Sequence, residues 1–243
     1  MAVFVFSSGV ASGGTGGSGG GGGVIPSPNK STFADNTWEE IIQACQESTV
    51  PDTWMVGDQK AMTINGAEYL IDIIGKNHDV YSDGTGTAPL TLQLHDLYGT
   101  EYSIHTSGDN SVGWTGCAVR TTHLPAILQL MPNEVQTAIR AVNKFTAMPS
   151  KADIQSTADK LFLLSEYEIF GKRSYSSIEE GTQYEYYLTT GNSLKYKGDK
   201  TDTWWERSPR TNSTFRYCMV TTSGAASIEA ATVVHPISFA FCF

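Results

Sequence analysis

Positive charge is scarce in this chain. Lys and Arg together number 16 against 25 Asp and Glu, and only 17% of the residues are charged. The net charge is −9, and no basic cluster stands out along the sequence. Proteins that bind nucleic acid or anionic membranes electrostatically need such clusters. We therefore expect neither nucleic acid nor an anionic membrane surface as the main partner.

Long apolar runs are lacking as well. No run approaches the roughly 20 residues of a membrane-spanning helix, so we expect no membrane insertion. Residues 1–6 are mostly apolar, but they lack a basic n-region and are followed by glycine-rich sequence, so we expect no signal peptide. A role outside the cell would then require that the protein leaves as part of a virion.

Cysteine is rare, and its spacing excludes two common motifs. Cys45, Cys117, Cys218 and Cys242 lie far apart, and no CxxC pair is present, so neither a zinc ribbon nor a thioredoxin-like site is expected. Two interpretations remain open. The thiols are reduced and pack as small apolar groups, or Cys218 and Cys242, which lie on segments expected to be close strands, form a disulfide.

Metal ligands at a useful spacing are also lacking. The candidate side chains follow neither an HxxxH pattern nor a calcium-loop pattern. They are His78, Asp79, Asp83, His95, Asp96 and His105. Histidine next to aspartate in a loop more often bonds to nearby backbone groups. We therefore expect no metal and no other cofactor.

Composition divides the chain into two parts. Gly and Ser dominate residues 7–23, and such tracts behave as flexible linkers; packed, extended polyglycine is the alternative. We expect residues 1–30 to form a short β-prone peptide followed by a linker. Residues 31–243 are long enough to bury a substantial core, and we expect them to fold as one domain.

Local signals predict the first secondary-structure elements. Thr37 and Glu40 have capping-box spacing ahead of a helical apolar stripe, which predicts a helix from residue 38 to about residue 47. Asn65 and Gly66 separate two β-prone segments and suit a type I′ turn, which predicts a hairpin over residues 61–74. We further expect a strand over 90–96, helices over 119–130 and from Pro132 through Val142, a short strand over 161–164 and a core strand over 237–243.

The last forty residues combine strongly specified ends with a permissive middle. Residues 204–209 and 239–243 are rich in bulky side chains, whereas residues 210–235 hold few candidates for a core. We expect a buried supporting frame that comprises Trp204, Trp205, Arg207, Phe215, Cys218 and Val220. Arg207 is flanked by Trp205 and Pro209, a setting that suits bidentate pairing with a carboxylate, for which Glu206 and Glu166 are the candidates.

Twelve positions in the permissive middle have mixed chemistry and follow no amphipathic period. We expect them to be exposed, to lie on one face and to bind a ligand: Arg210, Thr211, Arg216, Met219, Thr221, Thr222, Ser227, Ile228, Glu229, Thr232, Val233 and His235. A close-packed core does not accept varied side chains. The interleaved Phe215, Cys218, Val220 and Ala231 are therefore expected to point inward. A plain surface loop is the alternative interpretation.

This C-terminal pattern resembles the variable region of C-type-lectin-fold proteins diversified by retroelements, such as phage tropism determinants. In those proteins a Trp-Trp-x-Arg-Ser-Pro motif precedes the diversified positions, as at residues 204–209 here. Upstream motifs occur in matching order, among them Gly113-Trp114, Cys117 with Arg120, and Asp159-Lys160. The resemblance covers residues 54–243. It implies an α+β, C-type lectin-like fold with two or more helices around a small, mostly antiparallel sheet, and a variable region over residues 204–243.

The same resemblance implies a function. It is that of a receptor-binding adhesin with a hypervariable surface, carried on a phage tail and therefore located in the virion. Its partners would be a host cell-surface protein or glycan and other tail proteins; tail adhesins are usually trimeric, so a homotrimer is expected. A structural decoration protein without a specific receptor is the alternative.

The same resemblance also includes a class of enzymes. Formylglycine-generating enzymes share the lectin-type fold and use a cysteine pair near the C-terminus, which would correspond to Cys218 and Cys242. Cys242 lies in an apolar strand, however, and an apolar environment raises the pKa of a thiol and lowers its reactivity. We therefore expect no enzyme activity.

Overall fold

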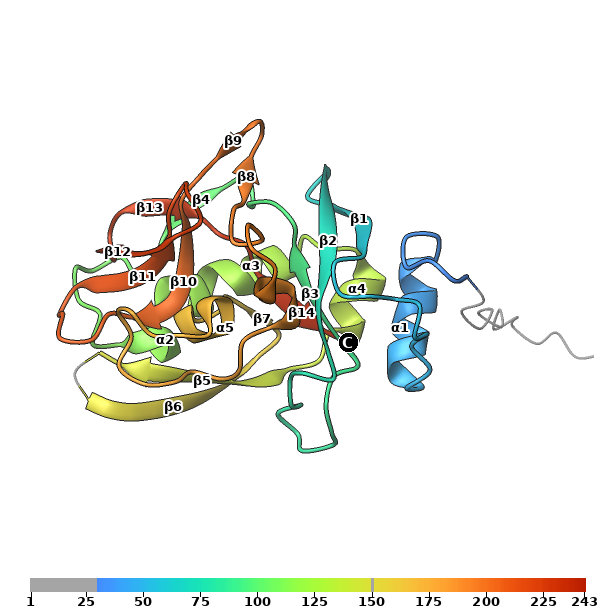
Figure 1. Cartoon of the computed structure of the whole chain (residues 1–243), viewed down its shortest axis with the longest axis horizontal. Coiled ribbons are helices and arrows are strands. Elements are labelled where there is room, and N and C mark those ends of the chain that lie inside the picture. The colour runs from blue at the N-terminus through green and yellow to red at the C-terminus, as the bar shows by residue number, and fades with distance from the viewer. Residues whose placement is uncertain (1–29, 150) are drawn as a thin grey trace, which may run out of the picture.

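The structure of the chain, a computed structural model, describes residues 30–149 and 151–243 (Figure 1). The peptide and linker expected over residues 1–30 lie, except for Lys30, outside the described residues. Strands account for 33% and helices for 18%, and the strands form five small antiparallel sheets. The expectation of an α+β, C-type lectin-like domain is therefore wrong. The fold is mostly β, because several segments for which the sequence predicted no strand form strand pairs.

The largest sheet has five strands in the order β1-β2-β3-β14-β7. β1 (Gln59–Ile64) and β2 (Ala67–Lys76) form the expected hairpin. At its turn Asn65 and Gly66 adopt φ angles of 51° and 76°, which a type I′ turn requires. β14 (Ala240–Cys242) lies between β3 (Leu90–Leu94) and β7 (Leu161–Phe162), which confirms the expected core strand at the end of the chain.

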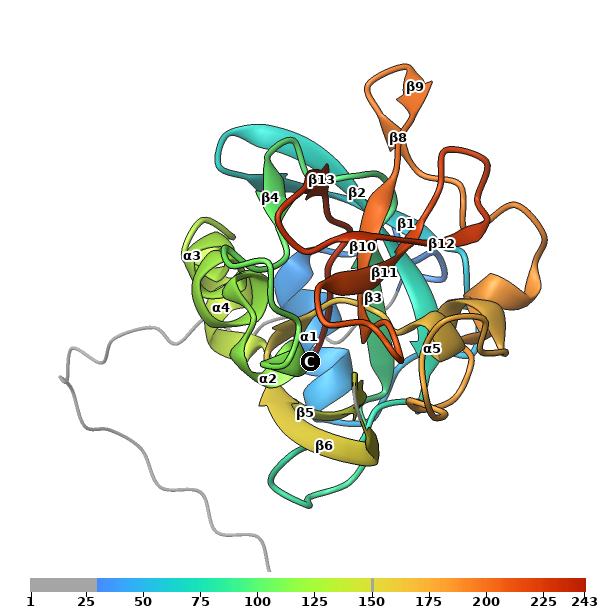
Figure 2. The same ribbon diagram turned by 90° about the vertical axis from the view of Figure 1, so that its left-hand side faces the viewer.

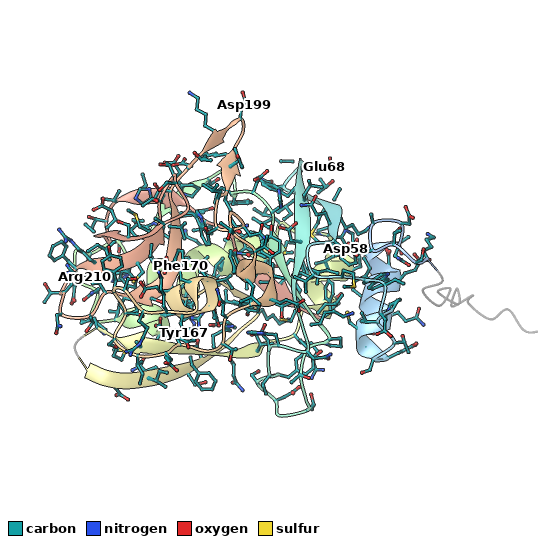
Figure 3. The ribbon with its side chains drawn as sticks, viewed as in Figure 1. Asp58, Glu68, Tyr167, Phe170, Asp199 and Arg210 are labelled. Carbon is teal, nitrogen blue, oxygen red and sulfur yellow. The ribbon has the colours of Figure 1, made fainter. Side chains whose placement is uncertain are left out.

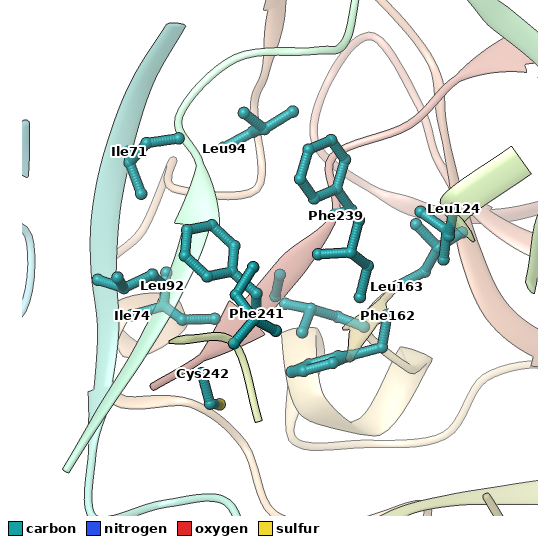
Figure 4. Packing of buried hydrophobic residues seen from close by; sticks show 14 of the residues in the cluster. Ile71, Ile74, Leu92, Leu94, Leu124, Phe162, Leu163, Phe239, Phe241 and Cys242 are labelled. Carbon is teal, nitrogen blue, oxygen red and sulfur yellow. The ribbon is translucent and has the colours of Figure 1, made fainter. Parts of the chain in front are cut away.

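Phe241 of β14 lies at the centre of the core. Its side chain is fully buried together with Leu92 of β3 and Phe162 of β7 (Figure 4). All five residues of β3 are buried, although its sequence alternates leucine with polar residues. The polar side chains are satisfied inside: Thr91 donates to Asp79 at 2.6 Å, and Gln93 donates to the Ser238 carbonyl at 3.2 Å. The sheet is therefore covered on both faces.

The helices are short and lie around this sheet. α1 (Trp38–Gln46) begins at Thr37 with the expected capping box, and Trp38 packs edge-on against Phe243 at a ring-centroid distance of 6.3 Å. The helix expected over residues 119–130 is instead a π-helical turn, η1 (Val119–His123), followed by α3 (Leu124–Leu128). The remaining helical segments are α2 (Gly113–Gly116), α4 (Asn133–Ala138), α5 (Glu166–Phe170) and the 3-10 turn η2 (Glu185–Leu188).

A long hairpin occupies a region in which the sequence predicted no strand. β5 (Val142–Met148) pairs with β6 (Lys151–Asp159) along the lower side of the molecule in Figure 1. Val142, expected at the end of a helical stripe, begins β5. The burial pattern of β5 is inverted, since Lys144 and Thr146 are buried whereas Phe145 is 43% exposed. No apolar alternation therefore marks this strand in the sequence.

Strands β10 to β13 lie at the end of the molecule opposite α1 (Figures 1 and 2). β10 (Trp204–Pro209), β11 (Arg216–Val220) and β12 (Ala226–Ala230) make a three-stranded sheet with β12 at its edge. β13 (Val234–Pro236) pairs with β4 (Glu101–Ser103), and β8 (Tyr196–Lys197) with β9 (Lys200–Thr201) forms a projecting hairpin. The segment expected to vary is thus built from strands joined by short turns.

All four cysteines are buried and unpaired. Cys242 lies in β14 of the five-stranded sheet, whereas Cys218 lies in β11 of a separate sheet, so the disulfide considered between them does not form. Within residues 30–149 and 151–243, none of the helices has the length and apolarity that crossing a bilayer requires.

The position of Phe241 can be tested by truncation. Phe241→Ala should lower the free energy of unfolding by about 3–5 kcal/mol, because it removes a fully buried ring. Phe145→Ala is the matched control and should cost less than about 1 kcal/mol, because much of that ring already meets solvent. Chemical denaturation measures both, and equal losses would contradict the central place of β14.

Candidate functional site

Arg207 is fully buried, and its guanidinium group joins several segments. Nε donates to Thr146 Oγ1 at 2.9 Å, and Nη1 donates to the Leu163 carbonyl at 3.0 Å. Both Nη groups also bond to the carboxylate of Glu168, with Nη2 3.0 Å from Oε1. Arg207 therefore connects β10 to β5, to the segment after β7 and to α5.

Neither carboxylate that the sequence suggested is the partner of Arg207. Glu206 is its neighbour in β10, and successive side chains of a strand point to opposite faces. Glu166 faces a loop instead, where its carboxylate accepts the N–H groups of Ser174 and Ser176, each at 2.8 Å. The partner is the acid two residues farther along α5.

Glu168 is positioned by the start of α5. Ser165 Oγ accepts the Glu168 N–H at 3.1 Å, and Glu168 Oε2 accepts the Ser165 N–H at 3.0 Å, so a capping box fixes the first turn. Glu168 Oε1 also lies 2.6 Å from Lys144 Nζ, and Lys144 Nζ lies 2.8 Å from Asp79 Oδ1. Arg207, Glu168, Lys144 and Asp79 form a chain of alternating charge, which we call the buried ion network.

The charges of this network balance. Burial alone raises the pKa of Glu168, but Arg207 and Lys144 outweigh it and hold the pKa below its usual value. Burial likewise raises the pKa of Asp79, but Lys144 and a hydrogen bond from Thr91 outweigh it and hold the pKa below its usual value. Both acids are therefore ionised at neutral pH. Each charge has a partner of opposite sign, which is the condition under which charges are tolerated in a protein interior.

A hollow of about 190 Å³ opens beside the network, between residues 78–80, β5 and residues 181–182. At its edge His78 stacks on Tyr184 with ring centroids 3.9 Å apart. Burial lowers the pKa of His78, so its imidazole is neutral at pH 7. The hollow is thus lined by hydrogen-bonding groups and by charges that already have partners. Across the described part of the chain, no three His, Cys, Asp or Glu side chains are arranged to hold a metal ion.

A second buried group of acids lies near the opposite face of β10. Glu206 is fully buried, and neither of its carboxylate oxygens has a hydrogen-bond partner among the described residues. Burial raises the pKa of Glu206, and the nearby Glu166 and Glu180 raise it further. Burial also raises the pKa of Glu180 to about 7. Burial and these acids therefore favour the protonated form of Glu206. Burial and these acids likewise raise the pKa of Cys218, which makes its thiol unfit as a nucleophile.

Five of the six residues expected in the supporting frame are fully buried. They are Trp204, Trp205, Arg207, Cys218 and Val220. Phe215, the sixth, was predicted wrongly and is 41% exposed. It precedes β11, where its backbone is held by the N–H of the buried Ala231, which donates to the Phe215 carbonyl at 2.8 Å. Its ring turns outward, with the guanidinium carbon of Arg216 5.0 Å from the ring centroid.

None of the twelve positions expected to bind a ligand is buried, and we call them the C-terminal surface. Thr222, Thr232 and Val233 are exposed, and the other nine are partly exposed: Arg210, Thr211, Arg216, Met219, Thr221, Ser227, Ile228, Glu229 and His235. The expectation that they share one face of the sheet is wrong, because Met219 pairs with Ser227 whereas Ile228 pairs with Cys218. Met219 and Ile228 thus point to opposite faces. The positions instead share one end of the molecule, around the edge strand β12 (Figure 2).

Sequence reasoning missed four residues of the buried polar groups around β10, namely Lys144, Glu168, Glu180 and Tyr184. A signal for Glu168 existed, since Ser165 and Glu168 have the capping-box spacing that located α1. Lys144 had none, because lysine is rarely buried and its neighbours gave no strand pattern.

Together these features define a mostly β domain that is held by a buried ion network and exposes its C-terminal strands at one end. The chain belongs to the family described as a domain of unknown function (DUF6273), whose sequence model matches residues 89–237. The matched stretch contains the C-terminal surface and every member of the network except Asp79. No curated protein and no solved structure was found to match the chain.

Loss of charge at Glu168 tests the network. Glu168→Gln should lower the free energy of unfolding by about 3–5 kcal/mol, because Arg207 and Lys144 would lose the anion between them. Glu68→Gln, the same change at an exposed position of β2, should stay within about 0.5 kcal/mol of the wild type. Urea denaturation measures both changes. A mild effect of Glu168→Gln would mean that the network does not depend on this charge.

The raised pKa of Glu180 predicts a pH dependence. Its folded value of about 7 exceeds the ordinary 4.5, so the stability that it contributes is complete below pH 4.5 and is lost as the pH rises through 7. Glu180→Gln cannot ionise. Its melting temperature should therefore rise relative to the wild type between pH 5 and pH 8, by an amount equivalent to about 3 kcal/mol at full ionisation. A difference in melting temperature between the two proteins that stays constant from pH 5 to pH 8 would show that Glu180 keeps an ordinary pKa.

Proposed function

We propose that the protein is a ligand-binding module, a receptor-binding adhesin of the phage-tail type that presents the C-terminal surface to a host protein or glycan. The proposal includes hypervariation of that surface, attachment to other tail proteins and a trimeric assembly in the virion. One observation carries it: twelve side chains of mixed chemistry, none of them buried, lie on and around strands β11, β12 and β13, next to the fully buried frame residues of β10 and β11.

The chemistry at this end of the molecule favours recognition. Phe215, Val233 and Val234 are 41%, 36% and 53% exposed, and the guanidinium carbon of Arg216 lies 5.0 Å from the Phe215 ring centroid. Figure 3 places Arg210 at the tip of the molecule that is farthest from α1. Aromatic and arginine side chains supply most of the binding energy at protein interfaces, particularly when apolar neighbours exclude water around them. A surface of this composition supports binding to a partner with apolar and acidic groups.

The backbone beneath the C-terminal surface supports exchange of its side chains. β10 and β11 are fixed by groups whose bonding partners lie outside that surface, such as the indole N–H of Trp204, which donates to the Ser193 carbonyl at 3.1 Å. Substitutions at partly exposed strand positions usually change stability by less than about 0.5 kcal/mol. The surface can therefore vary while the fold is kept. A weak single contact would be strengthened by avidity in a trimer.

A pair of double variants tests the binding surface. The labelled full chain is applied to a glycan array and to a panel of intact bacterial strains. Arg216→Ser with Ile228→Tyr should change the glycans or strains that are bound, because both changes lie on the C-terminal surface. Glu68→Ser with Leu70→Tyr makes the same kind of change at exposed positions of β2 and should keep the wild-type pattern.

Each other outcome argues against part of the proposal. Equal binding by both double variants would place the ligand site elsewhere on the molecule. A chain that binds no glycan and no strain would favour a structural decoration protein instead. Hypervariation is tested by sequences from sibling isolates, in which substitutions should concentrate at residues 210–235. An even spread over the domain would exclude diversification of this surface.

A further inference from the structure

A cavity outside the C-terminal surface lies where three upstream motifs of the sequence meet. Trp114 Nε1 donates to Asp159 Oδ2 at 2.8 Å, and Arg120 Nε donates to Asp159 Oδ1 at 2.7 Å. The cavity has a volume of about 260 Å³ and lies beside this group, between the η1–α3 segment and the junction of β6 with β7. The three motifs thus build one wall of a hollow that the proposed function does not use.

The Arg120 guanidinium presents an unused edge at this cavity. Its Nε is held by Asp159, and its Nη1 donates to the Thr115 carbonyl at 2.9 Å, whereas Nη2 forms none of the hydrogen bonds found among the described residues. Asp159 does not compete for an incoming group, because its Oδ2 already accepts bonds from Trp114 and, at 2.7 Å, from Thr157. A fixed guanidinium with one available nitrogen is suited to binding an oxyanion.

The remaining lining is one cation and several apolar side chains. Lys160 is exposed at the rim and takes part in none of the ion pairs of the described chain. Leu124 and Leu161, which are 1% and 5% exposed, form the floor, and the other apolar lining residues are Pro125, Leu128 and Ala158. With Arg120 and Lys160 against Asp159, the cavity carries one excess positive charge above an aliphatic floor. Its volume lies below the usual range of ligand pockets, so the ligand must be small.

The backbone of η1 supports a binding role independently. The Leu124 N–H donates to the Val119 carbonyl, which is the i to i−5 bond of a π-helical turn. Such turns are rare within helices and occur frequently at functional sites. Here the turn carries Arg120 on one wall of the cavity, and Leu124 of the floor follows directly after it.

We propose that this cavity binds a small aliphatic carboxylate. The carboxylate bonds to Arg120 Nη2 and to the Lys160 ammonium group, and the aliphatic chain lies on Leu124 and Leu161. The site is separate from the C-terminal surface, so either proposal can fail without the other.

Three probes of equal chain length test the chemistry of the site. Hexanoate, hexan-1-ol and hexylamine are titrated into the full chain and followed by ¹⁵N chemical shifts. Hexanoate should saturate, with shifts at residues 119–128 and 158–161, and the other two probes should bind at least about tenfold more weakly. Failure of hexanoate to saturate, or equal binding of hexan-1-ol, would overturn the proposal.

Three variants and a control test its location. Arg120→Lys keeps a charge but loses the guanidinium edge and should raise the Kd for hexanoate about tenfold. Lys160→Gln should raise it about threefold, and Ala158→Trp should abolish binding by filling the cavity. The last two change exposed residues and should keep the wild-type melting temperature. Lys172→Gln, an exposed change outside the cavity, should leave the Kd unchanged. Wild-type binding by both Lys160→Gln and Ala158→Trp would show that hexanoate binds elsewhere.

Discussion

The bidentate pair of Arg207 with Glu168 is the constraint on which the rest of the structure depends. Both groups are almost completely removed from water, so each must find its partners within the protein. Arg207 can satisfy its donors only if β5, β7 and α5 all reach their places around β10. An arrangement that misplaces one of them leaves a charge buried without a partner. The pair thereby favours one packing of these segments over its competitors.

Buried acids lie on both faces of β10, and their charges are accommodated differently on each face. On the side of Arg207, the acids remain ionised because cations lie within hydrogen-bonding distance. On the side of Glu206, no cation of the described residues bonds to the carboxylate, and burial together with neighbouring acids favours its protonated form. The two faces of one strand therefore hold acids in different charge states. Both groups flank β10, so the strand that leads into the C-terminal surface lies in an interior that contains buried polar groups.

Features that depend on residues close in sequence could be predicted, and features that depend on distant pairing could not. The capping box at Thr37 and the turn at Asn65 and Gly66 involve residues at most three positions apart, and both are present in the structure. The frame tryptophans and the exposure of the twelve positions also followed from residue type and composition. Phe215 was misjudged because its size suggested burial, whereas its surroundings at the start of β11 leave the ring outside.

The prediction of the fold class was wrong for a related reason. The fold class depends on which strands pair. β5 shows no apolar alternation in its sequence, because Lys144 is buried and Phe145 is exposed. The partner of Arg207 was missed because Glu168 is 39 residues away in sequence and is brought close only by α5. The resemblance of the C-terminal motif described the local chemistry of residues 204–209 without determining how those strands pack.

The inverted burial of β5 has a consequence for how the molecule comes apart. The five-stranded sheet packs in the apolar core, whereas the β5–β6 hairpin is also attached through the charges that meet Lys144 and through the bond that Arg207 donates to the Phe145 carbonyl. Protonation of Asp79 and Glu168 in strong acid would remove the ionic attachments at Lys144, whereas the apolar contacts around Phe241 carry no charge. We therefore expect the hairpin to open locally before that core, so that disassembly begins at one side of the fold.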